Sequence, residues 1–340
     1  MRRTVLTAGM AGIAILALTA CNPQGPGAGG GSDDASPDAA TLPDAVQIIV
    51  PADPGGGWDQ TGRAVSSTLT EDGLVSTASV SNVGGAGGTV GLAGLANERD
   101  PNTLMVTGLV MVGAVETNAA ETRMEDTTPI ARLTEEPLVV VVPASSEYQT
   151  LQDLIDDVVD NGQSVTITGG SAGGADHILA GLLLENAGLD GAEITEKLNY
   201  IPNAGGGEAV SLLLGDNASA GISGVGEFAQ YVESGDLRAL AVSSEEPAAL
   251  LPDAPTMVDE GFDVVYTNWR GLLAPGDITE DEKAGLVDLI GQMNESGTWE
   301  SVLETNGWTD AFLTGDEFDA FLSENIADVQ GTLQNIGLIQ

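Results

Sequence analysis

Six glycine-rich turns are the part of this 340-residue sequence whose residue types and spacing could do chemistry. Each follows a short apolar run and precedes a helical stretch: PADPGGGWD, GGAGGTVG, GLVMVGA, GGSAGGADH, PNAGGGEAV and GVGEFA. Glycine lets backbone N–H groups approach a ligand closely, and the start of the next helix adds unsatisfied N–H groups and a partial positive charge. Such turns can bind anions without basic side chains. One glycine is enough for a tight strand-to-helix turn, so any single turn also has an ordinary structural explanation.

Hydrogen bonds would have to supply most of the affinity of such a site. A micromolar ligand requires about 8 kcal/mol of binding free energy, whereas a helix dipole adds only about 0.3–1 kcal/mol. Hydrogen bonds to a charged group contribute about 1.5–3 kcal/mol each. Donors from two or three of the turns would therefore have to converge on one anion.

Three charged residues near these turns have more than one interpretation. Arg270 lies in the apolar segment VVYTNWRGLLAP, where a guanidinium near a cleft could clamp a carboxylate. It could equally form a salt bridge with one of the many acidic residues at a hinge. Asp59 and Arg63 are four residues apart at the predicted start of the first helix. This spacing predicts an ion pair that orients the first turn of that helix, and contact of Arg63 with the ligand is the alternative.

The composition excludes several other functions. The chain has 51 Asp and Glu against 10 Lys and Arg, and a net charge of −41 repels the phosphate backbone of nucleic acids. One His (His177) and one Cys (Cys21) are too few for a Cys/His zinc site or a disulfide scaffold. The Gly-Lys-Ser/Thr of a P-loop is absent, and the GxGxxA pattern at Gly224, Gly226 and Ala229 is a weak dinucleotide signal. We therefore expect no catalytic residue, no cofactor and no metal.

The N-terminal segment has the pattern of an export signal. Two arginines precede an apolar stretch that ends at Leu18 and is too short to span a membrane. The motif LTAC then fits a lipoprotein signal, in which the thiol of Cys21 carries diacylglycerol after cleavage; an ordinary secretory signal is the alternative. We predict a signal peptide over residues 1–20 and a flexible Gly-, Pro- and Asp-rich tether over 21–44. The mature protein would be extracytoplasmic and lipid-anchored to the cell membrane.

Alternating strands and helices must position the turns. The repeated strand–turn–helix pattern predicts an α/β fold with a parallel sheet. Two extended apolar segments, Leu138–Pro143 and Val264–Pro275, are predicted crossings of a two-strand hinge between two lobes, with a ligand cleft between them. Lobe 1 would comprise residues 45–142 and 266–340, and lobe 2 residues 143–265. A single domain with an inserted subdomain is the alternative.

A set of motifs in a fixed order resembles a known receptor family. In order along residues 45–335 the chain contains VPADPGGGWDQTGR, VSNVGGAGGTVGLA, TPIARL, ITGGSAGGADHILAG, NYIPNAGGGEAVSLLLGD, GISGVGEF, LRALAVSS, DAPTMVDEGFDV and NWRGLLAP. It resembles the substrate-binding receptors of tripartite tricarboxylate transporters, the Bug-type extracytoplasmic solute receptors. Trp58 and the NWRG motif resemble the corresponding residues of the tricarboxylate branch of that family.

The resemblance implies a two-lobed Venus-flytrap fold of the periplasmic-binding-protein, type II-like class. It implies a monomeric receptor, and not an enzyme, that captures a small organic carboxylate, either a tricarboxylate such as citrate or a dicarboxylate. The receptor would deliver its ligand to a membrane permease of one large and one small subunit. Asp53 departs from the family, in which an apolar or small residue is common in the first turn. A carboxylate there would repel an anionic ligand unless it points away or helps to hold a cation.

The family's carboxylate-holding turns correspond to residues 52–59 in one lobe and 169–177 in the other. The ligand-binding residues that the resemblance implies are Ala52, Gly55, Gly56, Gly57, Trp58, Asp59, Gly108, Gly170, Ser171, Gly173, Gly174, His177, Asn203, Gly205, Gly206, Ser223 and Arg270. Two other functions stay open: an envelope hydrolase that uses His177, and a flytrap sensor that presents its ligand to a receptor kinase.

Overall fold

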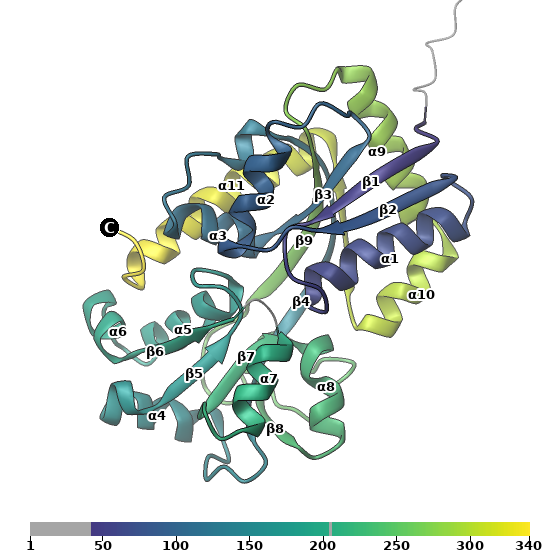
Figure 1. Cartoon of the computed structure of the whole chain (residues 1–340). Coiled ribbons are helices and arrows are strands. Elements are labelled where there is room, and N and C mark those ends of the chain that lie inside the picture. Colours follow the sequence, from purple (N-terminus) through teal and green to yellow (C-terminus); the bar gives the residue numbers. More distant parts are fainter. Residues whose placement is uncertain (1–41, 204–205) are drawn as a thin grey trace, which may run out of the picture. The chain divides into compact units, whose positions relative to one another are not determined.

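The structure is a computed structural model, and it describes residues 42–203 and 206–340. Cys21, the predicted signal peptide, nearly all of the predicted tether and Gly205 lie outside the described residues. The described strands form one mixed sheet in the order β2-β1-β3-β9-β4-β7-β5-β6, and β10 and β8 also pair with β4 (Figure 1). Its strands are β1 (Ala45–Val50), β2 (Thr77–Asn82), β3 (Thr103–Gly108), β4 (Thr128–Pro143), β5 (Thr166–Gly169), β6 (Asn199–Pro202), β7 (Ala220–Gly224), β8 (Leu237–Val242), β9 (Thr267–Ala274) and β10 (Thr309–Thr314).

The long strand β4 divides this sheet into two lobes. Up to Pro137 it pairs with β9 and β10, and from Leu138 onward it pairs with β7 and β8. Lobe 1 is therefore built on β1, β2, β3, β9 and β10, and lobe 2 on β5 to β8. Figure 1 shows β4 passing from one lobe into the other.

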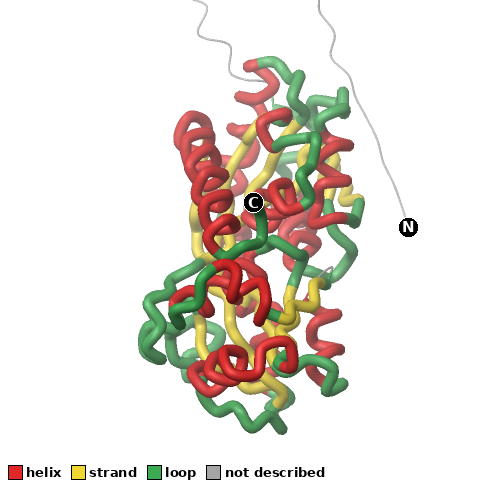
Figure 2. The backbone as a smooth tube through the Cα atoms, turned by 90° about the vertical axis from the view of Figure 1, so that its left-hand side faces the viewer, coloured by secondary structure: helices red, strands yellow, loops and turns green. Residues whose placement is uncertain are grey.

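Helices pack on both sides of the strands (Figure 2). They are α1 (Gly57–Glu71), α2 (Thr89–Leu95), α3 (Leu109–Thr117), α4 (Leu151–Asn161), α5 (Ala175–Asn186), α6 (Gly191–Lys197), α7 (Gly206–Leu214), α8 (Val225–Glu233), α9 (Glu280–Asn294), α10 (Gly297–Asn306) and α11 (Gly315–Asn335), with short 3₁₀ turns at Ala86–Gly88, Met124–Asp126 and Gly162–Ser164. Helix α11 buries Phe318, Leu322, Val329 and Leu333, which lie on one face at helical spacing.

The direction of the strands is only partly the predicted one. The strand–turn–helix units pair in parallel, as in β1 with β2 and β3, and β5 with β6 and β7. The pairs that involve β4 or β9 are antiparallel, so the prediction of a parallel sheet is wrong at the centre. The physical reason is that the chain leaves lobe 1 along β4 and returns along β9, and these two strands run in opposite directions.

The apolar run of β4 follows from burial on both of its faces. Leu138, Val140 and Val142 pack into the main core cluster, whereas Val139 and Val141 pack into a second cluster of lobe 2. Side chains of a strand alternate between faces, so a strand with a core on each side needs an unbroken apolar run. The sequence shows only this part of β4, because the preceding residues 128–137 mix polar side chains with two prolines.

The helices differ in how they begin. Four have a side-chain cap, which Thr150, Asp190, Thr279 and Ser296 provide to α4, α6, α9 and α10. Four others follow a glycine that has no side chain to offer: α1 follows Gly56, α3 follows Gly108, α5 follows Gly174 and α8 follows Gly224, whereas α2 follows Gly88 at the end of a 3₁₀ turn. The first N–H groups of these four helices have no acceptor within their own helix and none from a cap.

The two lobes also contact each other away from the sheet. A Cβ atom at Gly113, in α3, would overlap the carbonyl oxygen of Gly173 in lobe 2, so these two backbones are in direct contact. The hydroxyl of Thr117 donates to the Ala172 carbonyl at 3.5 Å. On another side, Ile336 at the end of α11 packs against Gly181 of α5.

Candidate ligand-binding site

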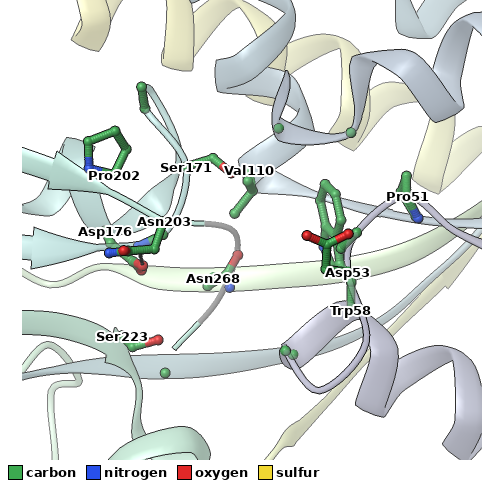
Figure 3. A pocket seen from close by; sticks show the side chains of 18 of the residues that line it. Pro51, Asp53, Trp58, Val110, Ser171, Asp176, Pro202, Asn203, Ser223 and Asn268 are labelled. Carbon is green, nitrogen blue, oxygen red and sulfur yellow. Dashed lines mark hydrogen bonds between the residues drawn. The ribbon is translucent and has the colours of Figure 1, made fainter. Parts of the chain in front are cut away.

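A cavity of about 440 Å³ lies between the lobes, and each of the six glycine-rich turns contributes at least one residue to its wall. The volume is in the range of small-molecule sites. The wall consists of Pro51, Ala52, Asp53, Gly56, Gly57, Trp58, Gly85, Ala86, Gly87, Gly88, Val110, Asn118, Glu136, Gly170, Ser171, Ala172, Asp176, Pro202, Asn203, Glu208, Ser223, Gly224, Glu227, Asn268 and Arg270. Figure 3 shows Ser171, Asp176 and Asn203 on one side, Asp53 and Trp58 on the other, and Asn268 between them.

Asp59 shapes the lobe 1 turn from behind. Its carboxylate accepts hydrogen bonds from the Gly55 N–H (3.0 Å), the Arg63 Nε (2.9 Å) and the Asn82 Nδ2 (2.9 Å). Asn82 also donates to the Ala52 carbonyl at 3.1 Å, so both ends of the turn are held by one network. Burial alone would raise the pKa of Asp59, but these donors outweigh it and hold the pKa below its usual value. The predicted Asp59–Arg63 ion pair is present, and its function here is to fix the turn.

His177 and Asp176 shape the lobe 2 turn in the same way. Nδ1 of His177 accepts the Gly173 N–H at 3.1 Å, and a carboxylate oxygen of Asp176 accepts the Gly170 N–H at 2.6 Å. The His177 ring stacks on Tyr200, with centroids 4.1 Å apart. Burial lowers the pKa of His177 to about 4, so the ring is neutral near pH 7. His177 therefore braces the turn and does not line the cavity.

A buried ion pair forms the floor of the cavity. Arg270, in β9, is 4% exposed and is paired with Glu136, in β4, which is 2% exposed. A Cβ at Gly57 would lie 2.9 Å from Cζ of Arg270, and one at Gly224 would lie 2.6 Å from Cδ of Glu136. These two positions therefore require glycine, because any side chain would collide with the pair. The salt bridge with a hinge acid, one of the two interpretations of Arg270, is present; Arg270 also lines the cavity, and its contact with a ligand carboxylate stays a prediction.

Two more carboxylates lie close to this pair. Glu227, in the first turn of α8, accepts a hydrogen bond from the Ser223 hydroxyl. Asp176 is 8% exposed, and burial, reinforced by Glu227 and Glu136, raises its pKa to about 7. Asp53 also lines the cavity and does not point away from it (Figure 3).

The structure brings together about half of the residues that the sequence predicted for the site. Those that line the cavity are Ala52, Gly56, Gly57, Trp58, Gly170, Ser171, Asn203, Ser223 and Arg270. Those that stand behind it are Gly55, Asp59, Gly108, Gly173, Gly174 and His177. Gly206 begins helix α7, and Gly205 lies outside the described residues.

Sequence reasoning missed Glu136, Asp176, Glu227 and Asn268. Three of them had a signal that could have been used: Glu136 lies two residues before the apolar run of the hinge strand, and Asp176 and Glu227 each lie in the first turn of a helix that follows a glycine-rich turn. Acidic residues are so common in this chain that their presence in the sequence alone does not distinguish them.

Comparison with known proteins gives the family of this two-lobed chain. Residues 62–338 match the tripartite tricarboxylate transporter family receptor. The chain belongs to this receptor family. Protein BugT of Bordetella pertussis is 28% identical over 305 residues, which cover 86% of this chain and 89% of BugT.

Two solved structures share the fold of this chain. MatC from Rhodopseudomonas palustris with bound malate aligns with a TM-score of 0.73 at 20% identity, over 86% of this chain and 100% of MatC. An R. palustris protein solved with adipate aligns with a TM-score of 0.77 at 18% identity, over 87% of this chain and 99% of that protein. The two-lobed periplasmic-binding-protein fold that the sequence predicted is thus confirmed. None of the helices in the described part of this receptor-family chain has the length and apolar character needed to cross a membrane.

Proposed function

We propose that this chain is an extracytoplasmic, lipid-anchored receptor that captures a small organic carboxylate between its lobes and delivers it to a two-subunit membrane permease. The observation that carries the proposal is the convergence of glycine-preceded helix starts on one cavity. The residues at the starts of α1, α5 and α8 line it from both lobes. Such starts present N–H groups and a partial positive charge to an anion. Two proteins that share this fold have been solved with malate and with adipate, which are small dicarboxylates.

A calorimetric titration tests ligand capture directly. The mature protein would be titrated with malate, adipate, succinate, their 2-amino analogues and citrate at pH 7.5. We expect a dissociation constant in the micromolar range or tighter for at least one of them. Absence of heat and of any thermal shift with the whole series would overturn the proposed function.

A designed N-cap identifies the helix starts as the ligand contacts. In Gly56→Asp the new carboxylate would accept the first N–H groups of α1, which stabilises the helix by about a few tenths of a kcal/mol relative to glycine and occupies the groups meant for the ligand. We expect at least a tenfold loss of affinity at unchanged or higher stability. Ser296→Asp is the matched control, because it adds the same charge at the N-cap of α10, away from the cavity. Equal affinities of the two variants would contradict the assigned contacts.

The membrane anchor and the permease need separate tests. We expect Cys21→Ser to move the protein from the membrane fraction to the soluble fraction of the cell envelope. We also expect ligand-loaded protein to restore uptake in vesicles that contain the permease, whereas the Gly56→Asp variant should not.

A further inference from the structure

The cavity wall contains more acidic side chains than we expect for a site that binds only an anion. Five acidic side chains line it, namely Asp53, Glu136, Asp176, Glu208 and Glu227, and among the described residues Arg270 is the sole basic side chain that does so. Arg270 is already paired with Glu136. A ligand that carries only negative charges would enter a cavity in which the carboxylates outnumber the single cation.

Resting on the proposed function, we infer that the ligand of this cavity carries a cationic nitrogen as well as a carboxylate, and that Asp176, Glu227 and Asn268 surround that nitrogen beside the Arg270–Glu136 pair. The carboxylate of the ligand is bound by the helix starts and by Arg270. The class of ligand is thus an amino acid or another ammonium-bearing carboxylate.

The first support is that Asp176 and Glu227 receive hydrogen bonds from neutral groups. Asp176 accepts the Gly170 N–H and Glu227 accepts the Ser223 hydroxyl. In the part of the chain that the structure describes, neither of them forms a salt bridge with a basic side chain. Two carboxylates that are held near each other at a cavity, and that form no salt bridge of their own, favour a ligand that supplies a cation.

The second support is a buried acceptor without a donor. Oδ1 of Asn268 has no hydrogen-bond partner, although the residue is only 7% exposed and its side chain lies in the cavity wall (Figure 3). Buried polar atoms in folded proteins are nearly always paired. An ammonium group has several N–H donors and can serve Asn268 and the carboxylates together.

The third support is that the same wall also has donors without acceptors. Nε and Nη1 of Arg270 have no partner, and this residue is 96% buried. Such N–H groups donate hydrogen bonds to a carboxylate. Unsatisfied donors and unsatisfied acceptors in one cavity match a ligand with both charges, and a plain dicarboxylate would satisfy only the donors.

A metal ion bound with the ligand fits these residues less well. Within residues 42–203 and 206–340, no group of three or more His, Cys, Asp or Glu side chains converges as a metal site would require. An ammonium group does not need a fixed coordination sphere, so it suits carboxylates that come from separate strands and helices.

Matched ligand pairs test the inference. The two members of each pair differ by one amino group, and the pairs are succinate and L-aspartate, glutarate and L-glutamate, and butyrate and 4-aminobutyrate. In calorimetric titrations at pH 7.5 with EDTA, we expect the amino member of at least one pair to bind at least tenfold more tightly than its partner. In Glu227→Gln this preference should fall at least tenfold, whereas Glu233→Gln, an exposed position on the same helix, should leave it unchanged.

The outcomes separate this inference from the proposed function. Tighter binding of the plain acids in all three pairs, or binding of a plain acid only when Mg²⁺ is added, would overturn the inference and leave the proposed function intact. Absence of binding by every compound, citrate and malate included, would overturn the proposed function itself. If Glu227→Gln does not fold, Asp176→Asn provides the same comparison.

Discussion

Replacing Gly113 with alanine should hold the lobes apart. Gly113 lies in α3 of lobe 1, and its α-carbon faces the carbonyl oxygen of Gly173 in the lobe 2 turn. The added Cβ would come well within 3.0 Å of that oxygen, a separation that real Cβ atoms essentially never show. Because both partners are backbone, the overlap is relieved only if the lobes separate at this contact.

The expected effect is on affinity and not on folding. Overpacking of this kind costs about 1–3 kcal/mol, and the cost applies only to the conformation in which the lobes touch. The apparent dissociation constant for the ligand should therefore rise about 5- to 150-fold. Alanine also stabilises the interior of a helix by about 1 kcal/mol relative to glycine, so the unliganded variant should unfold no more easily than the parent.

Calorimetry with the tightest ligand of the series and small-angle scattering measure the two consequences. The radius of gyration of the unliganded variant should exceed that of the unliganded parent. Gly94→Ala is the matched control, because it lies in a helix of lobe 1 with nothing within 4 Å of the new Cβ. An affinity for Gly113→Ala equal to that of Gly94→Ala would refute the reasoning. So would a loss of unfolding free energy in the unliganded variant, since the overlap would then lie within a folded lobe.

Three other predictions concern stability. Because the pKa of Asp176 is raised, its contribution to stability is fully present below the pKa of the unfolded chain and is lost as the pH rises to about 7. The free energy of unfolding measured with urea should therefore fall over this pH range, and the fall should be smaller in Asp176→Asn. Asp59→Ala should lower the free energy of unfolding by about 2–3 kcal/mol at pH 7. Because the pKa of Asp59 is lowered, this loss should shrink as the pH falls below about 4. A loss that does not depend on pH would contradict the hydrogen-bond network around the Asp59 carboxylate. Ile336→Ala should cost about 2–4 kcal/mol, because Ile336 is fully buried against Gly181 of the other lobe; a cost below 1 kcal/mol in urea titration would show that this contact is dispensable.

Strands and turns were predictable because their signals are local. The apolar run that precedes the turn PADPGGGWD is β1 (Ala45–Val50), and the run that precedes the turn GGSAGGADH is β5 (Thr166–Gly169). A short apolar run that ends in several glycines is a pattern of neighbouring residues, so it can be recognised in a single sequence. The first part of β4 and the strands β8 and β10 lack such a turn signal. The first part of β4 is defined by its pairing with β9 and β10, and β8 and β10 are defined by their pairing with β4.

The role of side chains in the site was harder to predict than their location. His177 lies in the predicted turn, yet its Nδ1 accepts a hydrogen bond from the Gly173 N–H and its ring stacks on Tyr200. These partners depend on the direction in which a side chain leaves the first turn of α5. Spacing along the chain does not define that direction.

The sequence by itself determined that this chain has glycine-rich turns after its strands, a strongly acidic surface and the motif order of a receptor family, because each of these is a property of adjacent residues or of composition. Only the tertiary structure decided which of the many acidic residues face the ligand cavity. Glu136, Asp176 and Glu227 come from three separate elements and meet around Arg270 only when β4 and β9 cross between the lobes. Their electrostatic effect depends on burial and mutual distance, and both arise from folding.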